Sequence, residues 1–296
     1  MTKNEKFQHL FSHYHCDELK DEYVKNETEK IITDNLEKNN NIEVYKECLN
    51  CVDLTSLNES DNETKIARMI EKVNDFENHF VNIKNVAAVC VYPSLVPIVK
   101  ETLTEPIAIA SVSAGFPASQ TFLEVKVAET SMSIMEGARE IDVVISVGKF
   151  LEEDYTAVYE ELSELKATCR DVHLKVILEV GALASAKNIK KASLLAMQAG
   201  ADFIKTSTGK IAVSATPEAT FVMCSAIKEW YEQTGQKVGY KVAGGVSTTE
   251  EVVKHYTLVQ QILGEEWLNN QLFRVGASRL ANQLLTSITG TEQNYF

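Results

Sequence analysis

Eight short apolar runs, each of strand length, recur along this 296-residue chain, and segments of amphipathic, helical pattern separate most of them. A continuous apolar run of this length is typical of a strand covered on both faces, as in a parallel sheet. Eight such runs alternating with helices predict an α/β fold, the (β/α)8 TIM barrel. The runs are residues 48–54, 86–91, 107–112, 141–147, 174–180, 202–206, 238–242 and 272–276.

An open, doubly wound sheet is the alternative for the same alternation of strands and helices. Neither GxGxxG nor GxxxxGK[ST] occurs in the chain, so the motifs of the nucleotide-binding sheets are missing and the barrel is favoured. The expected helices cover residues 64–80, 93–103, 119–136, 154–170, 185–199, 216–234 and 248–263.

Three segments follow from this pattern. Residues 1–44 are polar, and we expect a helical extension there with one helix over 21–38. Residues 45–285 form the predicted barrel, and residues 286–296 form a C-terminal tail.

The net charge is −13, from 42 acidic and 29 basic residues, and no dense Lys/Arg run occurs. This balance argues against a nucleic-acid partner. The apolar runs are far too short to span a membrane and the first residues lack an apolar signal core, so we expect no membrane partner and a cytoplasmic location. Six cysteines in this length do not indicate a disulfide-stapled domain.

Charged residues interrupt the strand pattern where a barrel carries its active site. Lys205 closes the sixth run, Lys241 lies in the seventh, and Asp142 lies in the fourth. A lysine in a buried strand is costly unless it is paired, so one reading is a structural ion pair with Asp53 or Asp142. The other reading is catalytic, because perturbed ionisable groups gather at functional sites.

Two neighbouring lysines suit a nucleophilic amine. An amine attacks a carbonyl only when it is neutral, whereas the usual lysine pKa is about 10.4. A second ammonium about 5 Å away costs roughly 3 kcal/mol at an effective dielectric near 20, or about two pKa units. We therefore expect one lysine to activate the other for Schiff-base chemistry.

Polar and glycine-rich loops follow the last three runs. They contain Thr208, Gly209 and Lys210 after the sixth run, Gly244 and Gly245 after the seventh, and Gly276 and Ser278 after the eighth. Barrels often bind phosphate with the loops after strands seven and eight and with a helix N-terminus. These loops predict a phosphate site beside the two lysines.

Several sequence blocks carry a family resemblance: FIKTSTGK at 203–210, KVAGG at 241–245, EIDVV at 140–144, VCVYP at 89–93, DLTSLN at 53–58 and FRVGAS at 273–278. Together they resemble the deoxyribose-phosphate aldolases over roughly residues 45–285. The resemblance implies a class I aldolase that reversibly cleaves 2-deoxy-D-ribose 5-phosphate to acetaldehyde and D-glyceraldehyde 3-phosphate, in deoxyribonucleotide catabolism.

By matching position, the resemblance implies that Lys205 forms the Schiff base, Lys241 lowers its pKa, and Asp142 moves protons together with water or Lys241. No cofactor and no metal is implied, because the protonated imine is the electron sink. The implied partners are sugar phosphates and aldehydes, and a homo-oligomer is left open. The implied substrate-binding residues are Asp53, Thr55, Asn58, Cys90, Thr208, Gly209, Lys210, Gly244, Gly245, Gly276, Ser278 and Arg279.

Other functions and roles stay open at this stage. The chain could be another Schiff-base aldolase, or a catalytically altered barrel that binds a sugar phosphate. Arg279 stands where many relatives have Ser or Thr; in the first turn of the last helix it either points to solvent or an acid, or contacts the phosphate. The tail carries Tyr295 and is either frayed or reaches the active site, as in relatives that end in a tyrosine.

Overall fold

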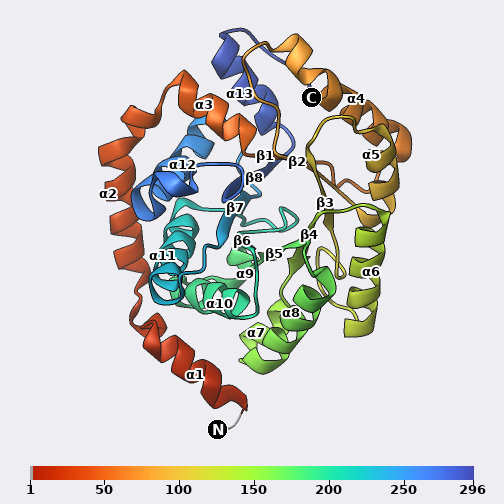
Figure 1. Ribbon diagram of the computed structural model, residues 1–296. Helices are drawn as coiled ribbons and strands as arrows, with labels where there is room; N and C mark the ends of the chain where they lie inside the picture. Colours follow the sequence, from red (N-terminus) through yellow and green to blue (C-terminus); the bar gives the residue numbers. More distant parts are fainter. Residues whose placement is uncertain (1–2) are drawn as a thin grey trace.

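The computed structural model describes residues 3–296, and its eight parallel strands close into one barrel in sequence order (Figure 1). This confirms the predicted TIM barrel. The strands are β1 (Val52–Thr55), β2 (Ala88–Val91), β3 (Ala108–Val112), β4 (Glu140–Val144), β5 (His173–Ile177), β6 (Phe203–Lys205), β7 (Gly239–Ala243) and β8 (Phe273–Ala277).

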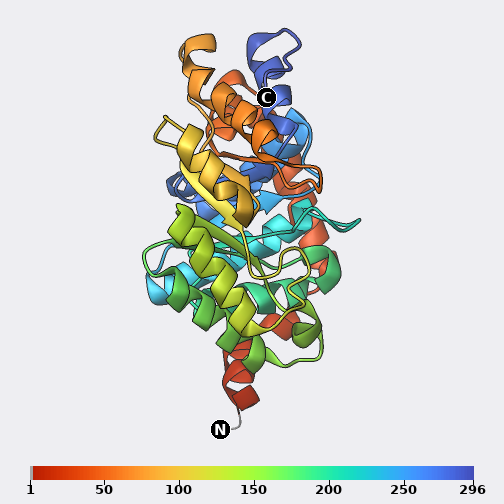
Figure 2. The ribbon, with the colours of Figure 1, turned by 90° about the vertical axis from the view of Figure 1, so that its right-hand side faces the viewer.

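Helices surround the barrel and connect consecutive strands (Figures 1 and 2). The long predicted helices are confirmed to within a few residues. They are α4 (Glu63–His79), α6 (Leu123–Glu136), α8 (Tyr155–Cys169), α10 (Ala186–Gln198), α11 (Pro217–Thr234) and α12 (Thr249–Leu263). Shorter helices are η2 (Pro93–Leu95), α5 (Val96–Thr102), α7 (Val147–Leu151), α9 (Val180–Leu183), η3 (Glu265–Trp267) and α13 (Leu280–Thr289).

The first predicted strand run began too early. Residues 48–50 belong to helix α3 (Ile42–Asn50), and the strand begins only at Val52. The Asn41 side chain caps this helix by accepting a hydrogen bond from Val44 N, and Val44, Cys48 and Leu49 form its buried face. The predicted domain boundary at 44/45 therefore lies inside a helix.

The N-terminal extension folds along one side of the barrel as α1 (Lys3–His13), η1 (Cys16–Glu18) and α2 (Asp21–Asn39) (Figure 1). The Phe11 ring meets Tyr155 of α8 edge-on at 4.9 Å between centroids. Asp21 Oδ1 accepts a hydrogen bond of 2.7 Å from Ala186 N at the start of α10. At the far end of α2, Asn39 Nδ2 donates to Thr257 Oγ1 of α12 at 3.0 Å.

The tail is ordered against the outside of the barrel, which contradicts the frayed alternative. The Tyr295 hydroxyl donates a 2.7 Å hydrogen bond to Lys72 O on α4. The Phe296 ring stacks on Phe76 at 5.5 Å, and Asn282 Oδ1 accepts hydrogen bonds from the backbone N–H groups of both tail residues. Tyr295 is thus held on α4 rather than at the strand ends.

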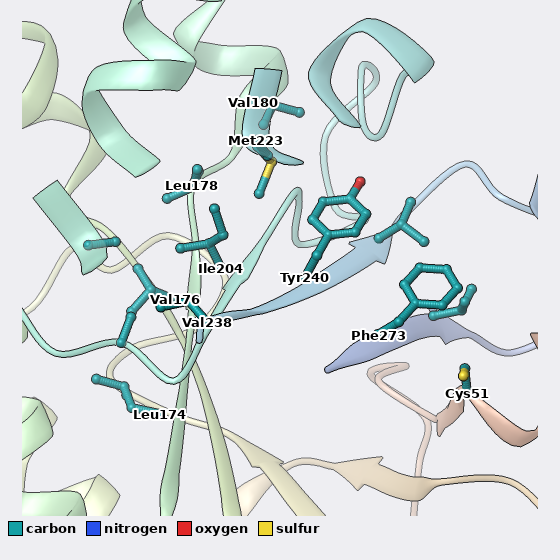
Figure 3. Packing of buried hydrophobic residues seen from close by; sticks show 14 of the residues in the cluster. Cys51, Leu174, Val176, Leu178, Val180, Ile204, Met223, Val238, Tyr240 and Phe273 are labelled. Carbon is teal, nitrogen blue, oxygen red and sulfur yellow. The ribbon is translucent and has the colours of Figure 1, made fainter. Parts of the chain in front are cut away.

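Strand side chains alternate between the helix layer and the barrel interior. Apolar residues of β5 to β8 point outward and pack with Met223 of α11, as Figure 3 shows for Val176, Ile204 and Tyr240. The interior side chains of β2 and β3 are small and include Ala88, Cys90 and Ala110. The charged side chains of the interior come from β1 and from β4 to β8, so the interior is divided into a small apolar side and a charged side.

Across residues 3–296, no helix combines the length and apolar character that crossing a membrane requires.

A buried histidine outside the barrel makes stability depend on pH. His255 Nδ1 lies 2.6 Å from Thr220 Oγ1, which lies 2.7 Å from the Tyr240 hydroxyl. Burial lowers the pKa of His255 to about 4. The unfolded chain binds this proton near pH 6.5 and the folded chain only near pH 4, so the free energy of unfolding falls as the pH drops through this window.

We expect His255 to contribute up to about 3 kcal/mol to that loss, because each pKa unit is worth about 1.36 kcal/mol. Urea unfolding of wild type and His255→Gln at pH 7 and pH 4.5 measures this contribution as the difference between the two pH dependences. His173→Gln, at an exposed position, is the control and should keep the wild-type dependence. An unchanged dependence in His255→Gln would contradict the prediction.

Candidate active site

A cleft of about 430 Å³ opens at the carboxyl ends of the strands. Lys205 lies in its wall, together with ten of the predicted substrate-binding residues, so residues far apart in sequence meet in one place. The lining residues are Thr55, Leu57, Asn58, Lys205, Thr208, Gly209, Lys210, Ala243, Gly244, Gly245, Val246, Ser247, Gly276, Ala277, Ser278 and Arg279.

Lys205 and Lys241 stand side by side on β6 and β7, where they are paired in register. Both ammonium groups donate to the same atom, Asp142 Oδ2, at 2.7 and 2.8 Å. Lys241 also donates to Asp53 Oδ2. The two lysines therefore form ion pairs and also lie next to each other. Features of both interpretations of the sequence are present together.

Three further charged residues lie deeper in the barrel. Lys175 Nζ donates to Glu140 Oε2 at 2.5 Å and to Asp142 Oδ1 at 3.1 Å. The Arg274 guanidinium donates to Asp53 Oδ1 at 2.6 Å and to Glu140 Oε1 at 2.8 Å. Lys175, Glu140 and Arg274 were not predicted as site residues, although each interrupts or borders an apolar run just as the two predicted lysines do.

This buried network holds four basic side chains and three carboxylates. One positive charge is therefore unbalanced when all seven groups are ionised. Burial penalises such an excess, since a buried charge is desolvated. The excess positive charge disappears when one of the four bases loses a proton.

The pKa shifts indicate which base that is. Burial and the charge of Lys241 lower the pKa of Lys205, and they outweigh its single carboxylate, Asp142. Burial alone would lower the pKa of Lys241 too, but Asp142 and Asp53 together raise it above its usual value. Despite burial, Lys175, Lys205 and Lys241 hold the pKa of Asp142 well below its usual range. Lys205 is thus the lysine that becomes neutral first, beside an ionised carboxylate and a charged lysine.

Asp53 and Cys90 lie beneath the cleft rather than in its wall, and both are fully buried. Asp53 reaches the site through Lys241. Burial and Asp142 raise the pKa of the Cys90 thiol to about 11, so it is protonated and packs with Ala88 and Ala110.

Glycines let two loops approach each other at the other end of the cleft. Gly244 and Gly245 have φ of 82° and 81°, in the left-handed region that favours glycine. A Cβ on Gly244 would lie 2.8 Å from Ser214 Oγ and 3.0 Å from Gly209 Cα, so a side chain there would push the loops apart.

Basic side chains complete this end. Lys210 Nζ donates to Leu57 O on the opposite side of the cleft. Arg279 lines the cleft and is the N-cap residue of α13, one position before the first turn in which it was predicted. The glycine-rich loops and these two cations therefore lie at the same end of the cleft.

Glu179, two residues after β5, is a fourth site residue that was not predicted. Its backbone is left-handed, with φ of 58°, and its carboxylate accepts hydrogen bonds from Thr208 N at 3.1 Å and Thr208 Oγ1 at 2.6 Å. These bonds fix the loop after β6. A left-handed residue at a strand end has no sequence signal when it is not glycine, which is why the role was not foreseen.

Within the described part of the chain, no group of three or more His, Cys, Asp or Glu side chains is arranged to hold a metal ion.

Known proteins resemble this chain over most of its length. The sequence model of the DeoC/LacD family aldolases matches residues 48–265. Deoxyribose-phosphate aldolase from Bos taurus is 39% identical over 260 residues, which cover 83% of this chain and 82% of that protein. The protein of the same name from Mus musculus is 44% identical over 216 residues, covering 71% of this chain and 68% of its own length.

Solved structures agree on the fold. The tetrameric deoxyribose phosphate aldolase from Aeropyrum pernix superposes with a TM-score of 0.65 at 24% identity, over 86% of this chain and 96% of that one. A structure described as QR15, an aldolase, gives a TM-score of 0.66 at 26% identity, over 81% and 96%.

The network predicts a large stability effect at Lys175. Lys175→Met removes a fully buried cation that lies within 3.5 Å of Asp53, Glu140 and Asp142, and the loss of these buried ion pairs should cost about 3–5 kcal/mol in the free energy of unfolding. Lys166→Met is the matched control, because the Lys166–Asp202 pair is partly exposed and should be worth about 1 kcal/mol or less.

Denaturant unfolding of both variants measures the difference. Adding Glu140→Gln to Lys175→Met should recover part of the loss, since it neutralises the carboxylate that Lys175 contacts most closely, at 2.5 Å. Equal, small losses in the two single variants would show that the network is not the stabilising unit inferred here.

Proposed function

We propose a specific reaction for this chain, which belongs to the DeoC/LacD aldolase family: the reversible cleavage of 2-deoxy-D-ribose 5-phosphate to acetaldehyde and D-glyceraldehyde 3-phosphate through a Schiff base on Lys205. Its family makes it an aldolase, a carbon–carbon lyase. The names of its relatives support the substrate. The observation that carries the mechanism is the pair of adjacent lysines whose pKa values shift in opposite directions.

The reaction begins with attack on a carbonyl. Neutral Lys205 Nζ attacks C1 of the open-chain sugar and forms a carbinolamine, which loses water to give a protonated imine. Asp142 lies within hydrogen-bonding distance of both lysines, so it can pass protons between Lys241, a water molecule and the carbinolamine oxygen. Lys241 keeps its charge during this step and so keeps the pKa of Lys205 low.

Cleavage follows from the imine. The C2–C3 bond breaks as the 3-hydroxyl gives its proton to Asp142 through a water molecule, and the electron pair of the broken bond moves onto the imine nitrogen, leaving an enamine on Lys205. The three-carbon aldehyde phosphate departs. Protonation of the enamine at C2 and hydrolysis of the resulting imine then release acetaldehyde and restore the amine.

The phosphate of the substrate belongs at the glycine-rich end of the cleft. We assign it to the backbone N–H groups around Gly244, Gly245, Gly276 and Ser278. Lys210 and Arg279 add positive charge there, within a protein of net charge −13. Thr55 and Asn58 line the side nearer β1 and are placed to contact the sugar hydroxyls. A substrate of this kind arises where deoxyribonucleotides are degraded.

Reductive trapping tests the covalent step. Incubation with acetaldehyde and borohydride should attach an ethyl group to Lys205, which peptide mass spectrometry locates. Lys205→Met should remain unlabelled at this site and produce no deoxyribose 5-phosphate from acetaldehyde and glyceraldehyde 3-phosphate. Labelling mainly at Lys241 or Lys210 would reverse the assigned roles, and no labelling with tight sugar-phosphate binding would indicate a binding protein.

The electrostatic role of Lys241 predicts a shift in pH dependence. Lys241→Met removes a positive charge next to Lys205 and leaves Asp142 with fewer partners, and both changes raise the pKa of Lys205. The acidic limb of the kcat/KM profile should therefore move to higher pH by about one unit or more. Partial recovery of activity at alkaline pH is the expected result.

Lys237→Met serves as the control, since Lys237 pairs with Glu266 on the surface. Its profile should match the wild type. If Lys241→Met is equally inactive at every pH, the electrostatic account of this lysine fails, whereas the assignment of Lys205 does not depend on it.

A further inference from the structure

A second cavity, of about 320 Å³, lies where the N-terminal extension meets the helices of the barrel. Its walls come from the start of α2, from α9 and from the amino-terminal halves of α10 and α11. Figure 1 shows α2 running beside α11 on this side of the molecule. The residues that line the cleft do not line this cavity, so the two are separate, and the volume is in the range of small-molecule sites.

The walls of the second cavity are mostly apolar. Val24 of the extension, Ile189 of α10 and Val222 of α11 are buried side chains that line it. Val213, in the loop between β6 and α11, also lines the cavity but is 57% exposed. A ligand with an apolar body would cover Val213 and displace water from the apolar walls, and this burial favours binding.

Charged residues at the second cavity favour a cationic ligand. Asp21, Lys25 and Glu218 line it. The Lys25 ammonium is offset by Glu29, whose carboxylate lies 3.9 Å away on the next turn of α2. Asp21 and Glu218 therefore give the lining a net negative charge, which attracts an ammonium group and repels a carboxylate.

The loop between β6 and α11 separates the second cavity from the cleft. Val213 and Ser214 of this loop line the cavity. A Cβ on Gly181 would lie 2.1 Å from Val213 O, so the absence of a side chain lets α9 support the loop closely. Toward the cleft, a Cβ on Gly244 would lie 2.8 Å from Ser214 Oγ. The loop is thus held between α9 and the glycine-rich end of the cleft.

Helix α9 provides a second connection between the two cavities. Val180 lines the second cavity, and its N–H donates a 3.0 Å hydrogen bond to Thr206 O after β6. The preceding residue, Glu179, accepts hydrogen bonds from the N–H and the hydroxyl of Thr208, which lines the cleft. A ligand that fixes Val180 and Val213 therefore also fixes backbone at the cleft.

We propose that the second cavity binds a small apolar amine in its protonated form, and that the bound amine strengthens phosphate binding in the cleft. The ammonium group lies near Asp21 and Glu218, and the apolar body contacts Val180 and Val213. The amine holds both connections in place, so less freedom is lost when the substrate binds, and the two ligands bind cooperatively. The coupling rests on the proposed function, whereas the binding of an amine does not.

Binding of a probe tests the cavity. N,N-dimethylphenethylamine is a tertiary amine, so it cannot form an imine with a sugar. Ligand-observed NMR should show binding in the millimolar range, as expected for a ligand of about ten non-hydrogen atoms. Glu218→Gln should weaken this binding about fivefold or more. Glu124→Gln, which changes an acid in the first turn of α6 away from the cavity, should bind like the wild type.

The probe 3-phenylpropionate has a similar apolar body but carries a carboxylate, and it should bind more weakly than the amine. Equal binding of the two probes, binding that Glu218→Gln does not change, or no binding of the amine would overturn the assignment of the cavity.

Steady-state kinetics test the coupling. A saturating concentration of N,N-dimethylphenethylamine should lower the KM for 2-deoxyribose 5-phosphate about twofold or more and leave the KM for unphosphorylated 2-deoxyribose unchanged. Glu218→Gln should abolish this effect at the same concentration. An amine that binds but changes neither KM would overturn the coupling. No turnover of either sugar would contradict the proposed function instead, and the NMR titration would still decide whether the cavity binds an amine.

Discussion

Seven charged side chains share the inside of one barrel, and the rest of the site depends on how their charges are compensated. Each carboxylate contacts at least two cations, so removing one partner affects the others. The arrangement is asymmetric in one respect: Lys205 has one carboxylate partner, whereas Lys241 has two. That difference separates two chemically identical amines into one that is easily deprotonated and one that stays charged.

The barrel makes this arrangement possible through residue size. The interior of β2 and β3 carries Ala88, Cys90 and Ala110, so the long side chains from the opposite strands have room to meet. Gly276 on β8 serves the same end, since a Cβ there would lie 3.1 Å from Lys241 Cε. The charged network therefore depends on the small residues opposite it, which leave the volume that the long charged side chains fill.

Much of this could be predicted from the sequence. The spacing of apolar residues locates the helices and strands, and the position of a charged residue within a strand locates the cleft. Long amphipathic segments located α4, α8 and α12 closely, and lysines inside apolar runs located the floor of the cleft. The short helix α3 was missed because its residues 48–50 join an apolar run that continues into β1. Helix α6 was also predicted, although its buried residues are Lys126, Thr130 and Ser133, since the helical period is the same whichever face is apolar.

The remaining parts depend on three-dimensional contacts, which the spacing of residues along the sequence does not reveal. Asp142 was foreseen near the lysines, but that one of its oxygens serves both of them follows from barrel closure. Lys175 and Arg274 were not predicted as site residues, because the spacing within their runs does not reveal that they meet Glu140, Asp142 and Asp53 inside the barrel. Both alternatives for the tail were wrong, because its docking depends on rings of α4, far away in sequence.

The contacts of the N-terminal extension also set an order of events during synthesis. Asp21 and Asn39 bind residues that follow them by 165 and 218 positions, and Phe11 packs on Tyr155. The ribosome therefore releases the extension long before its docking surface exists, and its rings stay exposed while half the chain or more is made. Such distant pairing slows folding and exposes apolar surface to other nascent chains. The many charged residues of α2, which keep that helix soluble on its own, suit a segment that must wait for the barrel to close.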